Sequence, residues 1–301
     1  MINYKIKLTF LTPMLGHGAT DAPEIRASSI RGQLHNWFRM LGGNIVQERA
    51  VFGGIKQKKA DFQGHEDTTA SRIIIRVRPF VGSIVDAPSL PHKGKDKSAP
   101  RKAYAAGTSC EIRVIDRLGG IADHAAEELF DRALRAWLLM GTLGFRSTRA
   151  AGSFAWECDE FPMPGNTNDY DSACKVVVEG SECRCALLET VYHDAEKARF
   201  VVSDSLGGPH SDDHKAVKDG KLADLAELNE PLGFVKGSKR KTSPLKYRVV
   251  KLEDGFHILA FWDGRGCVTG NGVGDFDEVV KLLAERKPKI GLQLKKGFGI
   301  I

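Results

Sequence analysis

The order in which strand-like and helix-like hydrophobic patterns follow one another in the first half of the chain constrains its fold most strongly. Residues 4–10 alternate apolar with basic or polar side chains, which predicts a half-buried strand with a basic outer face. Apolar residues then recur at helical spacing over residues 30–41, and Ser28 and Ser29 offer an N-cap for this helix. The chain therefore opens with a strand followed by an amphipathic helix.

The next elements complete a recognisable order. The patterns predict strands at residues 73–77 and 108–114, a long helix at 122–140 and a closing apolar segment at 153–156. The order of strand, helix, strand, strand, helix, strand is the βαββαβ arrangement of ferredoxin-like domains. It is also the arrangement of the RRM, whose sheet faces RNA. The polar residues 55–70 fit an insertion within this arrangement.

The second half of the chain carries weaker patterns. A Pro-, Gly- and Asn-rich stretch at 162–168 predicts a boundary between a domain at residues 1–160 and another at 161–301. Beyond it the patterns predict, in order, a strand at 174–178, a helix at 187–202, a polar segment at 203–219, a hairpin at 246–262 and an amphipathic helix at 276–283. We predict an α+β fold of two ferredoxin-like (RRM-like, βαββαβ) domains, the second degenerate.

Composition sets bounds on the function. Among 301 residues, 44 Lys and Arg face 38 Asp and Glu, and this surplus of +6 is too small to prove nucleic-acid binding. The N-terminus lacks a signal-peptide pattern and no run of about 18 apolar residues occurs, so we expect a cytoplasmic protein without a membrane span. The six cysteines lack zinc-site spacing, which favours free thiols.

A glycine-bracketed basic loop at residues 144–152 is the first candidate site. Gly144 and Gly152 let the backbone approach an anion closely, Arg146 and Arg149 add charge, and Ser147 adds a hydroxyl donor. The loop lacks the Lys-Ser/Thr ending of a P-loop. On pattern alone, a phosphate-binding loop and a tight turn with solvated arginines are equally favoured.

Three further basic segments could contact a phosphate chain. Arg31, His35 and Arg39 share one face of the first predicted helix. Residues 236–246 contain Lys239, Arg240 and Lys241 among other cations, and the mobile basic loop at 86–102 could order on RNA. An ordinary solvated surface is the competing explanation for each of these segments, and for the loop at 93–102 taken alone a disordered surface loop is favoured.

Catalytic signals are weaker. His17 lies between glycines and could act as a general base for RNA cleavage, but a lone loop histidine is more often a structural or binding residue. His210, Asp212, Asp213 and His214 resemble metal ligands without a second cluster at a defined spacing. The chain contains no nucleophile-elbow, zincin or Rossmann motif. We therefore predict no catalytic residue, no cofactor and no metal.

Two segments resemble the RAMP superfamily of CRISPR proteins. Residues 11–18 read LTPMLGHG and residues 24–39 read EIRASSIRGQLHNWFR, similar to the N-terminal strings of that superfamily. The glycine-rich loop at 144–152, followed by Ser153 and Phe154, is similar to the RAMP glycine-rich loop. The chain most resembles the first subunit of the Cmr (type III-B) effector complex, although His35 stands where members often carry arginine.

This resemblance implies a non-catalytic RNA-binding subunit. Its partners would be crRNA, possibly target RNA, and other Cmr-complex RAMP subunits, with backbone contacts near the 3′ end of the guide. The implied RNA-binding residues are His17, Arg26, Arg31, His35, Arg39, Gly144, Arg146, Ser147, Arg149, Gly152, Lys239, Arg240 and Lys241. Two alternatives stay open: a metal-independent RAMP endoribonuclease that uses His17 to process crRNA, and a scaffold that contacts only protein.

Overall fold

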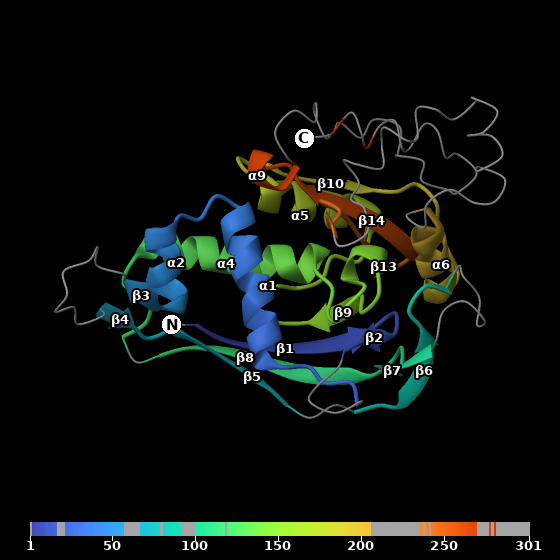
Figure 1. Ribbon diagram of the computed structural model, residues 1–301, viewed down its shortest axis with the longest axis horizontal. Coiled ribbons are helices and arrows are strands. Elements are labelled where there is room, and N and C mark those ends of the chain that lie inside the picture. Colours follow the sequence, from blue (N-terminus) through green and yellow to red (C-terminus); the bar gives the residue numbers. More distant parts are fainter. Residues whose placement is uncertain are drawn as a thin grey trace.

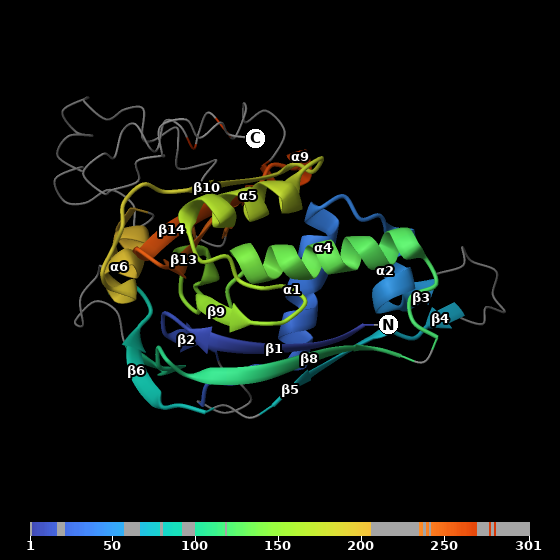
Figure 2. The ribbon, with the colours of Figure 1, turned by 180° about the vertical axis from the view of Figure 1, so that it is seen from behind.

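The structure is a computed structural model of the chain. It describes residues 2–16, 22–56, 67–78, 81–91, 100–117, 119–205, 235–236, 239–240, 242–269, 277 and 280. Figure 1 shows two sheets with helices between them, and Figure 2 shows the same layers from behind.

The first sheet contains the four strands that the sequence predicts. Its order is β5-β8-β1-β9, and every neighbouring pair is antiparallel. The strands are β1 (Asn3–Phe10), β5 (Ile73–Val77), β8 (Ser109–Asp116) and β9 (Phe154–Glu157). The predicted order of strand, helix, strand, strand, helix, strand is therefore confirmed for these elements.

Two helices cover one face of this sheet. They are α1 (Ala27–Met40) and α4 (His124–Met140), and both lie on the same side of the sheet in Figures 1 and 2. Their apolar stripes, with Trp37 and Trp137 almost fully buried, pack on the inward side chains of β1 and β8. The predicted serine N-cap of α1 is wrong, because the helix already begins at Ala27 and Arg26 occupies the N-cap position without a side-chain hydrogen bond.

A second sheet lies on the other side of these helices. Its order is β10-β14-β13, and its strands are β10 (Cys183–Leu187), β13 (Leu245–Leu252) and β14 (Gly255–Asp263). The predicted hairpin at 246–262 is confirmed as the antiparallel pair β13 and β14. Phe261 of β14 stacks on Trp37 of α1 with ring centroids 5.4 Å apart, so one hydrophobic core extends from the first sheet to the second.

The strand predicted at 174–178 is wrong, because these residues end helix α5 (Thr167–Val178). The run of three valines at 176–178 favoured a strand. In the structure the Asn166 side chain caps the helix, and Tyr170, Cys174 and Val177 turn one face into the core. The helix predicted at 187–202 is correct only in its second part, since β10 reaches Leu187 and helix α6 covers Ala195–Ser205.

Smaller elements surround the two sheets. They are β2 (Met14–Leu15), α2 (Ile45–Phe52), β3 (Gly54–Lys56), β4 (Asp67–Thr69), β6 (Ile84–Pro88), β7 (Pro100–Tyr104), β11 (Val235–Lys236), β12 (Lys239–Arg240) and α9 (Gly266–Thr269). The segment at 86–102, predicted as a loop, is thus bordered by two paired strands, β6 and β7, and residues 92–99 lie outside the described part. Of the helix predicted at 276–283, only Asp277 and Val280 are described, both as helical.

The free thiols predicted from the cysteine spacing are confirmed. All six cysteines are free thiols, and five of them are buried. None of the helices in the described part of the chain combines the length and the hydrophobicity that crossing a bilayer requires.

Candidate nucleic-acid interface

Two glycines with positive φ fix the backbone of the loop at 144–152. Gly144 has φ +87° and Gly152 has φ +66°, a region that favours glycine. A Cβ atom at Gly144 would collide with the carbonyl of Leu15, and one at Gly152 would collide with the carbonyl of Leu143. Both positions therefore require glycine for conformation and for space.

Backbone hydrogen bonds dock this loop onto the segment that precedes His17. Phe145 N donates to Leu15 O at 2.7 Å, and Gly152 N donates to Pro13 O at 3.0 Å. Thr12 Oγ1 donates to Ala150 O at 2.7 Å, in a fully buried position. The two segments that carry the family resemblance, far apart in sequence, are thus in direct contact.

Arg248 of β13 joins the two segments that flank the loop. This fully buried arginine donates to the carbonyls of Leu138 and Gly141, at the end of α4, and to that of Phe154 in β9. Its guanidinium also lies 4.4 Å from the centroid of the Phe154 ring. Burial lowers the pKa of Arg248 from its ordinary value. Sequence reasoning missed this residue, because a lone arginine in a strand gives no sign that it is buried.

The two arginines of the loop have different roles. Arg149 is half-buried and donates to Ser203 O of α6 at 3.0 Å, and burial together with the nearby Arg146 charge lowers its pKa. Arg146 has a left-handed backbone (φ 61°) and an exposed side chain. No hydrogen bond or ion pair joins the Arg146 guanidinium to another described residue. Arg146 is therefore available to an anion, whereas Arg149 ties the loop to the second half of the chain.

Phe145 of the loop contacts Arg101 of β7, and sequence reasoning did not predict this contact. The Arg101 guanidinium of β7 lies 5.5 Å from the centroid of the Phe145 ring. The neighbouring Lys102 pairs with Asp86 at 3.0 Å. β7 pairs with β2, and β2 in turn contacts the loop, so the proximity of Arg101 to Phe145 follows from strand pairing. In the sequence, only the basic composition of residues 93–102 indicated that this segment could bind RNA.

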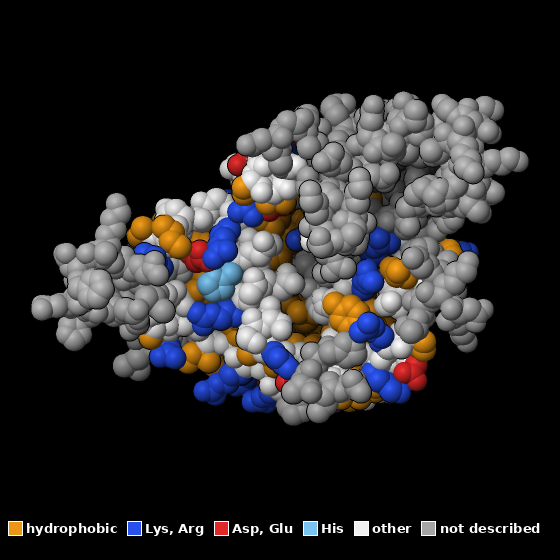
Figure 3. Space-filling model, in the orientation of Figure 1, with side chains coloured by type: hydrophobic (Ala, Val, Ile, Leu, Met, Phe, Trp, Pro, Cys, Tyr) orange, Lys and Arg blue, Asp and Glu red, His pale blue; other side chains and the backbone are white. Residues whose placement is uncertain are grey.

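The predicted cationic face of α1 is occupied by internal partners. Arg31 donates to the carbonyl of Phe52, His35 Nδ1 lies 2.5 Å from Glu48 Oε1, and Arg39 Nε donates to Glu48 Oε2 at 2.9 Å. Figure 3 shows these blue and pale-blue side chains along α1, with a red carboxylate beside them. These three groups hold α2 against α1, and their contact with RNA phosphates stays a prediction.

Glu48 of α2 accepts the hydrogen bonds of both His35 and Arg39. Its side chain is only 6% exposed, and burial alone would raise its pKa. Hydrogen bonds from Arg39 and His35 outweigh burial and hold the pKa of Glu48 below its usual range. The carboxylate is therefore ionised in the folded protein.

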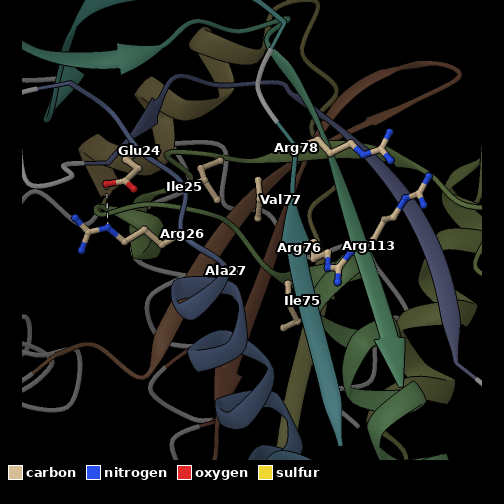
Figure 4. A pocket seen from close by; sticks show the side chains of 9 residues that line it. All are labelled: Glu24, Ile25, Arg26, Ala27, Ile75, Arg76, Val77, Arg78 and Arg113. Atoms are coloured by element: carbon tan, nitrogen blue, oxygen red, sulfur yellow. Dashed lines mark hydrogen bonds and ion pairs between the residues drawn. The ribbon is translucent and has the colours of Figure 1, made fainter. Parts of the chain in front are cut away.

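Arg26 lies in a separate open pocket of about 590 Å³ beside the edge strand β5. It pairs with Glu24 at 2.9 Å. Figure 4 shows Arg26 on one side of β5 and Arg76, Arg78 and Arg113 on the other. The sequence predicted Arg26 as a contact but did not predict the three arginines across the strand.

Several predicted residues cannot be placed. His17, Lys241 and the cluster at 210–214 lie outside the described residues, and only the backbone of Lys239 and Arg240 is described, in β12. Within the part of the chain that the structure describes, no group of three His, Cys, Asp or Glu side chains could hold a metal ion.

The fold and the docked loop define a class of protein. Mixed α/β structure with several antiparallel sheets is consistent with the fold of a RAMP protein, and the glycine-rich loop lies against the segment that follows the first strand. The sequence model of the RAMP superfamily matches residues 7–155, a segment that includes α1, α4 and the glycine-rich loop. The comparison with curated proteins gives no significant match.

Solved structures share this fold along nearly the whole chain. The chain is similar to apo Cmr1 from Pyrococcus furiosus, with 17% identity, 98% of each chain covered and a TM-score of 0.56. It is also similar to a chain of the type III-B Cmr-β complex bound to cognate target RNA and AMPPnP in the presence of ssDNA, with 10% identity, 96% and 99% covered and a TM-score of 0.62. At these identities the likeness establishes the fold.

Proposed function

We propose that this chain is a non-catalytic RNA-binding subunit of a type III-B CRISPR (Cmr) interference complex that acts in antiviral defence. It contacts the backbone of crRNA, or of the crRNA–target duplex, near the 3′ end of the guide. Its partners are the guide RNA and neighbouring RAMP subunits. The likeness to Cmr1 over 98% of both chains supports the assignment to such a complex.

The observation that carries RNA binding is the exposed Arg146 on a rigidly anchored loop. Rigid placement lowers the entropic cost of binding an anion, since the loop is already held by Leu15, Pro13 and Thr12. An exposed guanidinium can bind a phosphate bidentately without reading a base. The expected binding is therefore tolerant of RNA sequence, as suits a protein whose guide RNA provides specificity.

We also propose that the chain consists of two ferredoxin-like domains, at residues 1–160 and 161–301. The first contains the four-stranded sheet with α1 and α4. The second is degenerate, with the three-stranded sheet β10-β14-β13 and helices α5 and α6. The two share the buried contact between Trp37 and Phe261 within one hydrophobic core.

The test is RNA binding by the full chain with Arg146 replaced. Arg146→Ala should weaken binding to a single-stranded guide RNA for every sequence and lower the slope of log K against log salt by about 0.7 to 1. Arg135→Ala removes another exposed arginine, on α4, and serves as the matched control. Equal affinities of Arg146→Ala, Arg135→Ala and the wild type would favour a scaffold that contacts only protein.

The endoribonuclease alternative has its own test. The purified chain is incubated with repeat RNA in EDTA, which removes metal-dependent contaminants. The proposal expects intact RNA. Specific cleavage that is lost in His17→Ala would replace the proposal with the processing enzyme.

A further inference from the structure

The face of the first sheet that points away from α1 and α4 carries a strong positive charge. We call it the outer sheet face. In Figures 1 and 2, α1 and α4 lie on the opposite side of this sheet, and no helix of the described part of the chain crosses its outer face. The cations that point outward from it are Lys5 and Lys7 of β1, Arg76 and Arg78 at β5, and Arg113 of β8.

Three of these cations form a row across neighbouring strands. Arg76 lies directly opposite Arg113, and Arg113 lies directly opposite Lys5. Like charges in directly opposed positions repel and weaken a sheet. An anionic ligand bound on this face would reduce the repulsion.

The acidic side chains of this face compensate only in part. Glu111 pairs with Lys5 at 3.4 Å and with Arg78 and Arg113 at 3.1 Å each, and Glu157 pairs with Lys7 at 2.8 Å. The five cations therefore face two carboxylates, which leaves a net charge of +3 on the described residues of this face. Arg76 is exposed, and no described residue forms a hydrogen bond or ion pair with its side chain.

The charge continues around the edge of the sheet. β5 is an edge strand, and the open pocket beside it is lined by Arg76, Arg78 and Arg113 on the outer side and by Arg26, which pairs with Glu24, beyond the edge. In Figure 4, Ile75 and Val77 point from β5 toward Ile25, whereas the arginines point away from them. Cations therefore approach this edge from both faces of the strand.

The outer sheet face has no aromatic side chain among its described residues. Its outward residues are Asn3, Lys5, Lys7, Thr9, Ile74, Arg76, Arg78, Ser109, Glu111, Arg113, Ile115, Ala155 and Glu157. An RRM sheet binds bases by stacking them on aromatic rings, which this face cannot do. A protein interface has an apolar, often aromatic centre, and here the apolar residues are few. Cations repeated about 4.8 Å across and 6.8 Å along the strands instead suit a chain of phosphates.

We infer that the outer sheet face, together with Arg26 at the β5 edge, is a second RNA-binding surface that contacts phosphates and reads no bases. This inference rests on the proposed function and extends it. The glycine-rich loop and this face then contact the RNA at separate places. Among the cations of this face, Arg76 contributes most to RNA binding, because its guanidinium is exposed and lies opposite a second arginine.

The test compares charge reversals in the full chain, with single-stranded RNA of mixed sequence as the probe. Arg76→Glu should weaken binding roughly tenfold, the effect of one lost charge-assisted contact, and lower the salt slope by about 0.7 to 1. Arg135→Glu on α4 makes the same charge change outside this face and should alter affinity much less. Arg76→Lys should retain most of the affinity.

Thermal unfolding separates a binding role from a structural one. Arg76→Glu places a carboxylate opposite Arg113, so the variant should unfold at the same or a higher temperature while it binds RNA more weakly. Unchanged RNA affinity in Arg76→Glu, with a loss in Arg146→Ala, overturns the second surface and leaves the proposed function standing. Unchanged affinity in both overturns both. Retained RNA affinity with failure to join the other subunits would identify the face as a protein-docking surface and overturn the inference.

Discussion

Replacing Gly152 by alanine tests whether the loop is held by space as well as by conformation. Gly152 and Gly180 have nearly the same φ, +66° and +68°, so alanine at either costs roughly 1–2 kcal/mol from the left-handed backbone. At Gly180 the new Cβ meets no atom within 4 Å. At Gly152 it collides with the carbonyl of Leu143, and the backbone must move.

The movement has a cost that can be estimated from the hydrogen bonds of Gly152. Its N–H donates to Pro13 O and its carbonyl accepts from Leu143 N, both at 3.0 Å, in a buried position. Each buried group left unpaired costs about 1–3 kcal/mol. Gly152→Ala should therefore lower the free energy of unfolding by at least about 3 kcal/mol, against about 1–2 kcal/mol for Gly180→Ala.

The assay is urea unfolding followed by tryptophan fluorescence, since Trp37, Trp137 and Trp262 are fully buried. RNA affinity of Gly152→Ala, measured below its unfolding transition, should fall together with stability, because the loop that presents Arg146 is displaced. Equal losses of stability in the two glycine variants would refute the account of a loop fixed by the approach of Leu143.

Two further predictions concern buried charges. Arg248→Met keeps the aliphatic stem but leaves three carbonyls unpaired, and it should lower the free energy of unfolding by about 3 kcal/mol. Arg184→Met removes a half-exposed arginine that also binds carbonyls, and a loss as large as that of Arg248→Met would contradict this reasoning. Because the pKa of Glu48 is depressed, its stabilising contribution is present above about pH 4 and is lost as pH falls through the folded-state pKa. Acid titration of stability should therefore be steeper in the wild type than in Glu48→Gln, in which Arg39 and His35 lack a charged partner, and parallel curves would contradict it.

The first half of the fold could be predicted because its periodicities are long and regular. β1 buries one face and α4 carries a long apolar stripe, so sequence spacing alone identifies them. The second half contained a local conflict, since the β-branched run at 176–178 opposed the helical spacing of Tyr170 and Cys174. Residues 176–178 are helical because α5 buries one face against α4, where the Tyr170 hydroxyl donates a hydrogen bond to the Leu139 carbonyl.

The candidate site could be predicted in part. The positions of Gly144 and Gly152 were visible, because a glycine-bracketed basic loop between a helix and a strand is a local pattern. The partner of the α1 cations was not, because Glu48 lies on a different helix and its burial follows from packing. The outer sheet face was equally hidden, since the row of Arg76, Arg113 and Lys5 exists only once the strand register is known.

The most direct measurement is ultraviolet crosslinking of the full chain to guide RNA in the assembled ribonucleoprotein, with the crosslinked peptides identified by mass spectrometry. We expect crosslinks within residues 141–153, where the exposed Arg146 lies beside the half-buried Phe145. Crosslinks confined to other segments, or none to this chain in a complex that still contains it, would contradict the account.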